Sequence, residues 1–225
     1  MQGAPGPLTS SAIRILGVDP AAIGPTGYGI IETDGRRCRT LGYGALRIPS
    51  ERQEQSPGAA LSKVYALLCR LIEEFSPHSL AVEAVFAARN VKTALRLAEV
   101  RGVVLLAAAQ HEVAVYSYSP REVKATIAGY GHADKRQVQV MVRALLSMSE
   151  TPEPADAADA LAVALCHVQI EGTRQKFDLP PPALLTRSLA RPERLPRAAG
   201  PGAREDHATP GARSRISTNR RSRLP

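Results

Sequence analysis

The hydrophobic pattern near the N-terminus predicts three consecutive β-strands. The apolar run from Ile13 to Val18 is typical of a buried strand, and the Gly- and Pro-rich segment 21–27 predicts a turn. A strand pattern resumes over 28–31, and a third spans 38–48. Strands joined by such short connections pair antiparallel, so we expect a three-stranded meander.

The pattern then changes to helical spacing and alternates with short strands. Apolar residues spaced for a helix follow Ser56-Pro57, where serine is a good N-cap and proline suits the first helical position; this helix ends at Ser76-Pro77. Strands are predicted at 79–86 and 113–118, separated by a helix over 90–110 that Asn90 can cap. Each later strand therefore follows a helical crossover.

Two capping boxes and a long apolar segment predict helices in the last part of the pattern. Ser119 with Glu122, and Asp134 with Gln137, have the spacing of a capping box, and the final helix covers 155–168. The complete order predicts an α/β fold: a mixed five-stranded sheet, with three antiparallel strands and then parallel ones, flanked by helices.

Composition indicates one soluble globular domain with a basic tail. Of the 225 residues, 44% are hydrophobic and 22% charged. The net charge of +8 is unevenly distributed: Lys and Arg number 17 against 16 Asp and Glu in residues 1–170, and 12 against 5 in residues 171–225. We expect a flexible extension over 1–12, a folded domain over 13–170 and a disordered Pro-, Gly- and Arg-rich tail over 171–225. Any polyanion site on the folded domain must come from local clustering of charge.

Cysteine usage and the N-terminal segment predict a cytoplasmic protein. The three cysteines are odd in number and lack the spacing of a zinc site or a disulfide framework. The first twelve residues lack the basic and apolar regions of a signal peptide, and the longest apolar run, 103–109, is too short to span a bilayer.

Four carboxylates stand at positions that call for a partner. Asp19 ends the first strand, where it could cap a turn or hold a metal or phosphate, and Glu83 lies inside an apolar strand. Asp156 and Asp159 share one face of the first turn of the last helix, and the alanines around them supply no counter-charge. Oxygen-only ligands suit Mg²⁺ or Mn²⁺, and two such ions about 3.5–4 Å apart could catalyse phosphodiester hydrolysis.

Three motifs resemble the RuvC family of Holliday-junction endonucleases. They are GVDP with TGYG at 17–29, AVEAVF at 81–86 and ADAADALAVALCH at 155–167, and the resemblance extends over about residues 13–169. It implies an RNase H-like fold in which Asp19, Glu83, Asp156 and Asp159 bind two Mg²⁺ ions, for which Mn²⁺ can substitute, with Asp19 as the bridge. Metal-activated water would then cleave the scissile phosphodiester, leaving a 5′-phosphate and a 3′-hydroxyl.

The resemblance also implies partners and DNA contacts. The family acts as a homodimer that nicks two strands of a four-way junction symmetrically in recombination and repair, together with the RuvA–RuvB branch-migration complex. The long apolar helix 90–110 is a candidate dimer element. The residues expected to contact DNA are Phe86, which stacks on a base, and Arg89, Asn90, Lys124, Lys135 and Arg136. The alternatives are core packing for Phe86 and solvated helix faces for the basic residues, and we expect His167 at a helix C-terminus rather than as a ligand.

The first loop departs from the family pattern. The family usually has glycine directly after Asp-Pro, whereas this chain has Ala21-Ala22 and a loop about one residue longer. If that glycine served a left-handed conformation, alanine would be strained there, and the extra residue could relieve the strain.

Three other functions compete with the junction nuclease. A strand ending in Asp before a Gly- and Thr-containing turn also resembles the phosphate loop of actin-like ATPases and sugar kinases, but nothing after residue 171 can supply their second lobe. A non-catalytic junction-binding protein would gain from losing carboxylates that repel phosphate. An RNase H-type nuclease acting on another structured nucleic acid is the main alternative, because fold alone does not fix the substrate.

Overall fold

The computed structural model of the chain describes residues 12–21, 24–47, 58–84 and 91–179. The strands are β1 (Ile13–Asp19), β2 (Pro25–Thr33), β3 (Cys38–Arg47), β4 (Ser79–Glu83) and β5 (Ala114–Tyr118). The helices are α1 (Ala59–Phe75), α2 (Val91–Gln110), α3 (Pro120–Ala128), α4 (Lys135–Leu145) and α5 (Ala155–Lys176). None of the described helices combines the length and apolar composition needed to cross a bilayer.

The five strands form one mixed sheet in the order β3-β2-β1-β4-β5. The pairs β1–β2 and β2–β3 are antiparallel, whereas β1–β4 and β4–β5 are parallel, which confirms the predicted sheet. Because β1, β4 and β5 run in the same direction, their C-terminal ends meet at one edge of the sheet.

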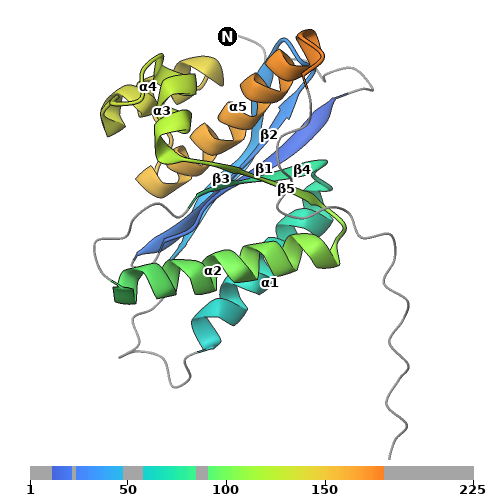
Figure 1. The fold of residues 1–225 in the computed structure, drawn as a ribbon, viewed down its shortest axis with the longest axis vertical. Helices are drawn as coiled ribbons and strands as arrows, with labels where there is room; N and C mark the ends of the chain where they lie inside the picture. The colour runs from blue at the N-terminus through green and yellow to red at the C-terminus, as the bar shows by residue number, and fades with distance from the viewer. Residues whose placement is uncertain (1–11, 22–23, 48–57, 85–90, 180–225) are drawn as a thin grey trace, which may run out of the picture. The chain divides into compact units, whose positions relative to one another are not determined.

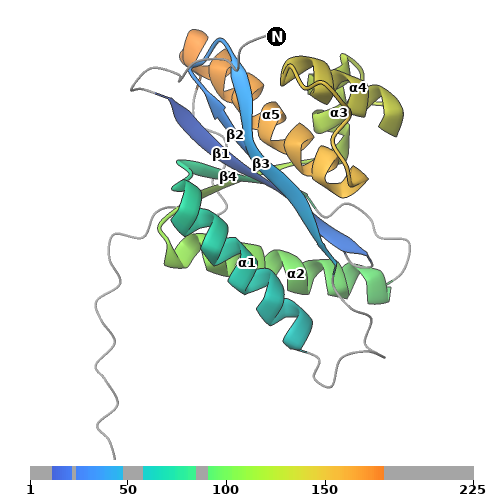
Figure 2. The same ribbon diagram turned by 180° about the vertical axis from the view of Figure 1, so that it is seen from behind.

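Helices cover both faces of the sheet and enclose two separate cores. Figures 1 and 2 show α1 and α2 on one face, and α5 with α3 and α4 on the other. Side chains alternate accordingly along β1: Leu16 and Val18 pack in the core with α1 and α2, whereas Ile15 packs in the core with α5. This alternation decides which polar side chains of the strands face α5.

Helix α5 lies directly against β1 and β2 because glycines leave room for its backbone. A Cβ atom added to Gly17 would lie 2.1 Å from the carbonyl oxygen of Ala160, and one added to Gly27 would lie 1.9 Å from that of Asp156. Since Gly27 pairs with Asp19 in the β1–β2 ladder, this contact brings the first turn of α5 to the end of β1.

Both predicted capping boxes are present. The Ser119 hydroxyl accepts a hydrogen bond from the Glu122 N–H, and the Asp134 carboxylate accepts one from the Gln137 N–H. In each box the side chain of the third helical residue also accepts a hydrogen bond from the N–H of the capping residue. These boxes set the starts of α3 and α4, as the sequence predicted.

Several predicted boundaries are wrong. The predicted turn 21–27 is shorter, because β2 already begins at Pro25, and α1 begins at Ala59 rather than at Pro57. Helix α5 continues to Lys176, beyond the predicted start of the tail at residue 171, and Arg174 and Glu171 form an ion pair one turn apart in this polar segment. The predictions for residues 1–11 and 180–225 lie outside the described residues.

Candidate active site

Strand geometry brings Asp19 and Glu83 together. Along β1, Gly17 and Asp19 alternate with residues of the α1–α2 core and therefore face α5, and Glu83 faces the same way on β4. Val18 pairs with Val82 in the parallel ladder, so Asp19 and Glu83 are the next residues on neighbouring strands. Their carboxyl groups interact with each other, and burial is the largest cause that raises the pKa of both.

The first turn of α5 adds two more carboxylates. Asp156 and Asp159 are one turn apart near the N-terminus of the helix, where the helix dipole favours negative charge. Burial, and then the charges of Glu83, Asp159 and Asp156, raise the pKa of Asp19 to about 9. All four predicted carboxylates, from β1, β4 and α5, therefore form one electrostatic cluster.

Basic side chains of α3 and α4 approach this cluster. The Lys135 Nζ lies 2.6 Å from Oδ2 of Asp159. Burial opposes the charged form of Lys135, but the hydrogen bond and charge of Asp159 outweigh it and raise the lysine pKa. Burial also raises the pKa of Glu83, against the opposing effect of the positive charges of Lys124 and Lys135. The alanines that flank Asp159 in the sequence supply no counter-charge; α4 provides one, because folding brings in a residue 24 positions away.

The four carboxylates are suitable ligands for a hard divalent cation, although they contact one another and Lys135. Among the residues described, no three Asp, Glu, His or Cys side chains are placed to hold a metal ion. The carboxyl groups of Asp19 and Glu83 interact with each other, and Asp159 contacts the Lys135 ammonium. A divalent cation would suit this cluster, because all the donors are carboxylate oxygens, the ligands that Mg²⁺ and Mn²⁺ prefer.

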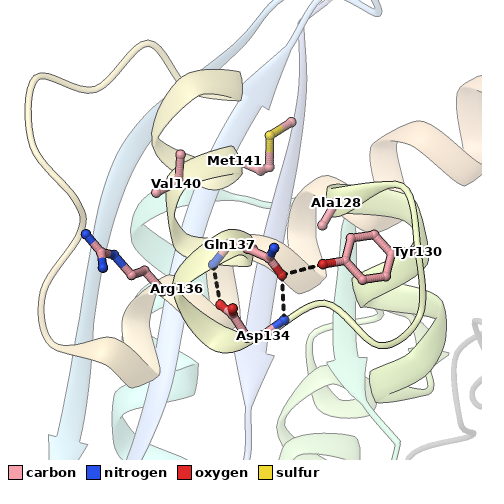
Figure 3. Close-up of a pocket in the computed structure, with 7 residues that line it drawn as sticks. All are labelled: Ala128, Tyr130, Asp134, Arg136, Gln137, Val140 and Met141. Atoms are coloured by element: carbon pink, nitrogen blue, oxygen red, sulfur yellow. Dashed lines mark hydrogen bonds between the residues drawn. The ribbon is translucent and has the colours of Figure 1, made fainter.

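Of the remaining predicted DNA contacts, the structure describes only Arg136. Phe86, Arg89 and Asn90 lie outside the described residues. Arg136 belongs to the rim of a pocket of about 340 Å³ between α3 and α4. Figure 3 shows its side chain extending away from a hydrogen-bonded group in which Tyr130 Oη donates to Gln137 Oε1 (2.5 Å) and the Asp134 N–H donates to the same oxygen (2.9 Å). Arg136 is thus exposed and takes no part in these hydrogen bonds.

His167 is a buried core residue, which corrects its expected place at a helix C-terminus. Helix α5 continues nine residues beyond it, and the ring is 5% exposed. Its Nε2 lies 2.9 Å from Ser79 Oγ and its Nδ1 lies 2.7 Å from Tyr118 Oη. A neutral imidazole satisfies both bonds, and burial lowers the pKa of His167 to about 4. The apolar pattern of α5 gave no signal for partners on β4 and β5.

In the loop after Asp19, a residue with a positive φ lies directly before β2. Gly24 has a φ of 103°, a conformation that glycine adopts without strain. Ala21 is described and does not have a positive φ, whereas Ala22 lies outside the described residues. The extra loop length therefore comes with a glycine at the position that needs one.

Comparison with known proteins decides the family. The sequence profile of the family described as crossover junction endodeoxyribonuclease RuvC matches residues 15–167. The chain belongs to the RuvC family. It is 42% identical to the RuvC of Alkaliphilus oremlandii over 165 residues, which are 73% of this chain and 98% of that one. It is 45% identical to the RuvC of Natranaerobius thermophilus over 163 residues, or 72% and 99% of the two chains.

A solved RuvC structure has the same fold. The Thermus thermophilus RuvC in complex with a Holliday junction substrate matches with a TM-score of 0.66 and 33% sequence identity, over 72% of this chain and 96% of that one. The RuvC profile covers the C-terminal part of β1, all of β4 and the first turn of α5, and thus all four carboxylates. The predicted RNase H-like α/β fold is confirmed.

Proposed function

We propose that this RuvC-family chain is a structure-selective endodeoxyribonuclease that resolves four-way (Holliday) junctions by paired symmetric nicks in recombination and repair. The observation that carries the proposal is the convergence of four carboxylates from β1, β4 and α5 in a chain whose relatives are crossover junction endodeoxyribonucleases. Carboxylates repel phosphate, so a protein that only bound junctions would be weakened by them. Their presence favours catalysis.

The proposed metal ligands are Asp19, Glu83, Asp156 and Asp159, which would hold two Mg²⁺ ions. When bound, the ions would activate water and stabilise the attacking and leaving oxygens of the phosphodiester, giving 5′-phosphate and 3′-hydroxyl ends. Lys124 and Lys135 are suited to holding DNA phosphates beside the carboxylates, because both exert their positive charge on Glu83. Arg136, Phe86, Arg89 and Asn90 remain further candidates for DNA contacts.

Cleavage of a synthetic four-way junction tests the proposal. Wild type is compared with Asp156→Asn in Mg²⁺ and in EDTA, on the junction, on a matched linear duplex and on an RNA–DNA hybrid. Asp178→Asn is the matched control, because Asp178 is an exposed aspartate beyond the C-terminal end of α5. We expect Mg²⁺-dependent paired nicks on the junction alone, lost in Asp156→Asn while junction binding persists, and unchanged in Asp178→Asn.

Other outcomes identify the competing functions. Equal cutting of duplex or hybrid would indicate an RNase H-type nuclease with another structured substrate. Binding of the junction without cutting by wild type would indicate a non-catalytic binding protein.

Helix α2 is the proposed homodimer element. One side of this helix packs against α1 and the sheet, and its outer side exposes Val91 (75%), Leu95 (60%) and Leu106 (52%). At 100° per residue these three side chains share one face with Gly102, so they form one apolar strip along the helix. Symmetric dimers pair the same surface of both subunits, and an apolar strip suits such pairing.

Gly102→Glu tests the dimer surface. A Cβ at Gly102 meets no atom within 4 Å, so the monomer can accept the side chain, whereas a dimer through this strip would bury its charge. We expect a monomer in sedimentation analysis and loss of paired nicking. Gly172→Glu is the control, because Gly172 is an exposed helical glycine of α5 with equal space around it. An unchanged dimer in Gly102→Glu would contradict the assignment.

The RuvA–RuvB branch-migration complex is the proposed partner at the junction. This proposal rests on membership of the family rather than on a surface of the described residues. Adding RuvA–RuvB to the cleavage reaction tests it: we expect faster or redirected cutting, and no change in rate or position would contradict it.

A further inference from the structure

Arg101 reaches the end of β4 from the side of the sheet opposite to the carboxylates. It lies in the middle of α2, and its Nη1 donates a hydrogen bond to the backbone carbonyl of Glu83 (3.1 Å). Its Nη2 donates to Oγ of Ser117 on β5 (3.1 Å). One guanidinium therefore links the ends of two parallel strands to a helix.

The alternation of side chains explains why both contacts come from the α2 side. Val115 of β5 packs in the α1–α2 core, and Ser117, two residues on, faces the same way. The Glu83 side chain points to the other face, toward α5, while its carbonyl remains within reach of Arg101. The acid is thus presented on one face while its backbone is held from the other.

Glu83 stands where the chain leaves the sheet, so its position depends on few contacts. It is the last residue of β4, and the N–H of the next residue, Ala84, donates to the carbonyl of Tyr118 (2.8 Å). Arg101 binds the carbonyl of the same peptide group. Both the carbonyl and the N–H of the Glu83–Ala84 peptide group are therefore hydrogen-bonded. The direction of the Glu83 side chain follows from the orientation of that backbone.

The partners of Arg101 are neutral, which indicates positioning rather than charge pairing. The guanidinium is half-buried, and burial lowers the pKa of Arg101. Its hydrogen bonds go to a carbonyl and a hydroxyl. The rigid fork of an arginine holds two acceptors in a fixed relation, which a lysine with one ammonium cannot do.

We propose that Arg101 is a positioning residue for Glu83, fixing the end of β4 so that the carboxylate meets Asp19, Asp156 and Asp159. The inference rests on the proposed function, because the role of Glu83 as a metal ligand is part of it. Groups that orient ligands in this way typically change metal affinity or activity about 10–100-fold when removed.

The test compares Arg101→Met and Arg101→Lys with wild type by three measurements. They are hydrogen exchange of the Ala84 amide, calorimetric binding of Mn²⁺ in the absence of DNA, and junction cleavage with kcat and KM separated. For Arg101→Met we expect faster Ala84 exchange, Mn²⁺ affinity lower by about tenfold, and kcat lower by about 10–100-fold with KM nearly unchanged. Arg101→Lys keeps one donor and is expected to fall between.

Arg14→Met is the matched control. Arg14 also donates to a backbone carbonyl, that of Phe75 (3.0 Å), and to a side chain, that of Glu32 (3.0 Å), but at the opposite end of β1 from Asp19. We expect this variant to lose stability while keeping the Mn²⁺ affinity and kcat. It separates the general cost of losing a bridging arginine from an effect on Glu83.

The outcomes distinguish this inference from the proposed function. Wild-type Ala84 exchange and Mn²⁺ affinity in Arg101→Met would overturn the positioning role. If Arg101→Met does not fold, Arg101→Lys and Ser117→Ala, which frees one arm of the fork, decide by the same measurements. Changed exchange and Mn²⁺ affinity, in a chain whose wild type cuts no junction, would overturn the proposed function and leave the positioning role standing.

Discussion

Gly27→Ala tests whether the close contact between α5 and β2 assembles the carboxylates. The new Cβ would lie 1.9 Å from the Asp156 carbonyl oxygen, 2.5 Å from its carbonyl carbon and 3.2 Å from the Ala157 nitrogen. All three atoms belong to the backbone of the first turn of α5, so no side-chain rotation can relieve the clash. Helix and strand must move apart.

The required movement can be worked out from these distances. Ordinary van der Waals contact begins at 3.4 Å, so the Asp156 backbone must shift by about 1.5 Å. Overpacking of this kind costs about 1–3 kcal/mol, which for a domain of this size lowers the Tm by about 2–12 °C. A displacement of about 1 Å at reacting groups can cost about 10²-fold in rate. We therefore expect junction cleavage to fall about 100-fold while the protein remains folded.

The assay measures junction cleavage, junction binding and thermal unfolding in parallel. Gly42→Ala on β3 is the control, because its Cβ would meet Phe75 at 3.6 Å and Ile30 at 3.9 Å, which are ordinary contacts. This control should keep wild-type cleavage and lose little stability. Gly27→Ala should still bind the junction, because the substitution leaves every basic side chain in the protein. Cleavage and Tm equal to wild type in Gly27→Ala would refute the role of the contact.

Three further predictions concern charge. The pKa of His167 is about 4 in the fold and about 6.5 when unfolded, so the free energy of unfolding should fall by about 3 kcal/mol as the pH drops from 6.5 to 4. When denaturation is measured at several pH values, His167→Gln should remove this dependence, whereas His132→Gln, at an exposed histidine, should retain it. Lys135→Met should reduce the slope of log K for junction binding against log salt concentration by about 0.9, because one phosphate contact is lost. Lys176→Met, near the far end of α5, should leave this slope unchanged. An unchanged slope in Lys135→Met would limit Lys135 to pairing with Asp159. Asp19→Asn should abolish cleavage but raise the Tm in EDTA, because it replaces a buried acid that Glu83, Asp159 and Asp156 repel by a neutral amide; a lower Tm would contradict this.

Local signals in the sequence predicted most of the fold and the four carboxylates. Period-two and helical spacing identified the strands and helices, and the capping boxes at Ser119 and Asp134 located the starts of α3 and α4. The carboxylates could be predicted because each breaks a local rule: Asp19 ends an apolar strand, Glu83 lies among apolar residues, and Asp156 and Asp159 repel each other on one helical turn. Whether these residues bind metal remains a prediction.

The sequence could not predict contacts between distant segments. Lys135 supplies the counter-charge of Asp159 from another helix, and the partners of His167 are 88 and 49 residues away. Gly27 was assigned to a turn because glycine is typical of turns, although its role is to leave room for α5 within a strand. Apolar spacing predicts an end of this helix at residue 168, whereas α5 continues through a polar segment to Lys176.

The site therefore depends on packing against both faces of the sheet. The α5 face brings the Asp156 backbone against Gly27, and the α2 face holds the Glu83 carbonyl through Arg101. Between them, four carboxylates lie together, offset by the lysines of α3 and α4. Such an arrangement opposes folding, so the two apolar cores must provide the stability that the acids remove. This explains why rigid elements, rather than loops, carry all four acids: only a packed framework can hold like charges so close together.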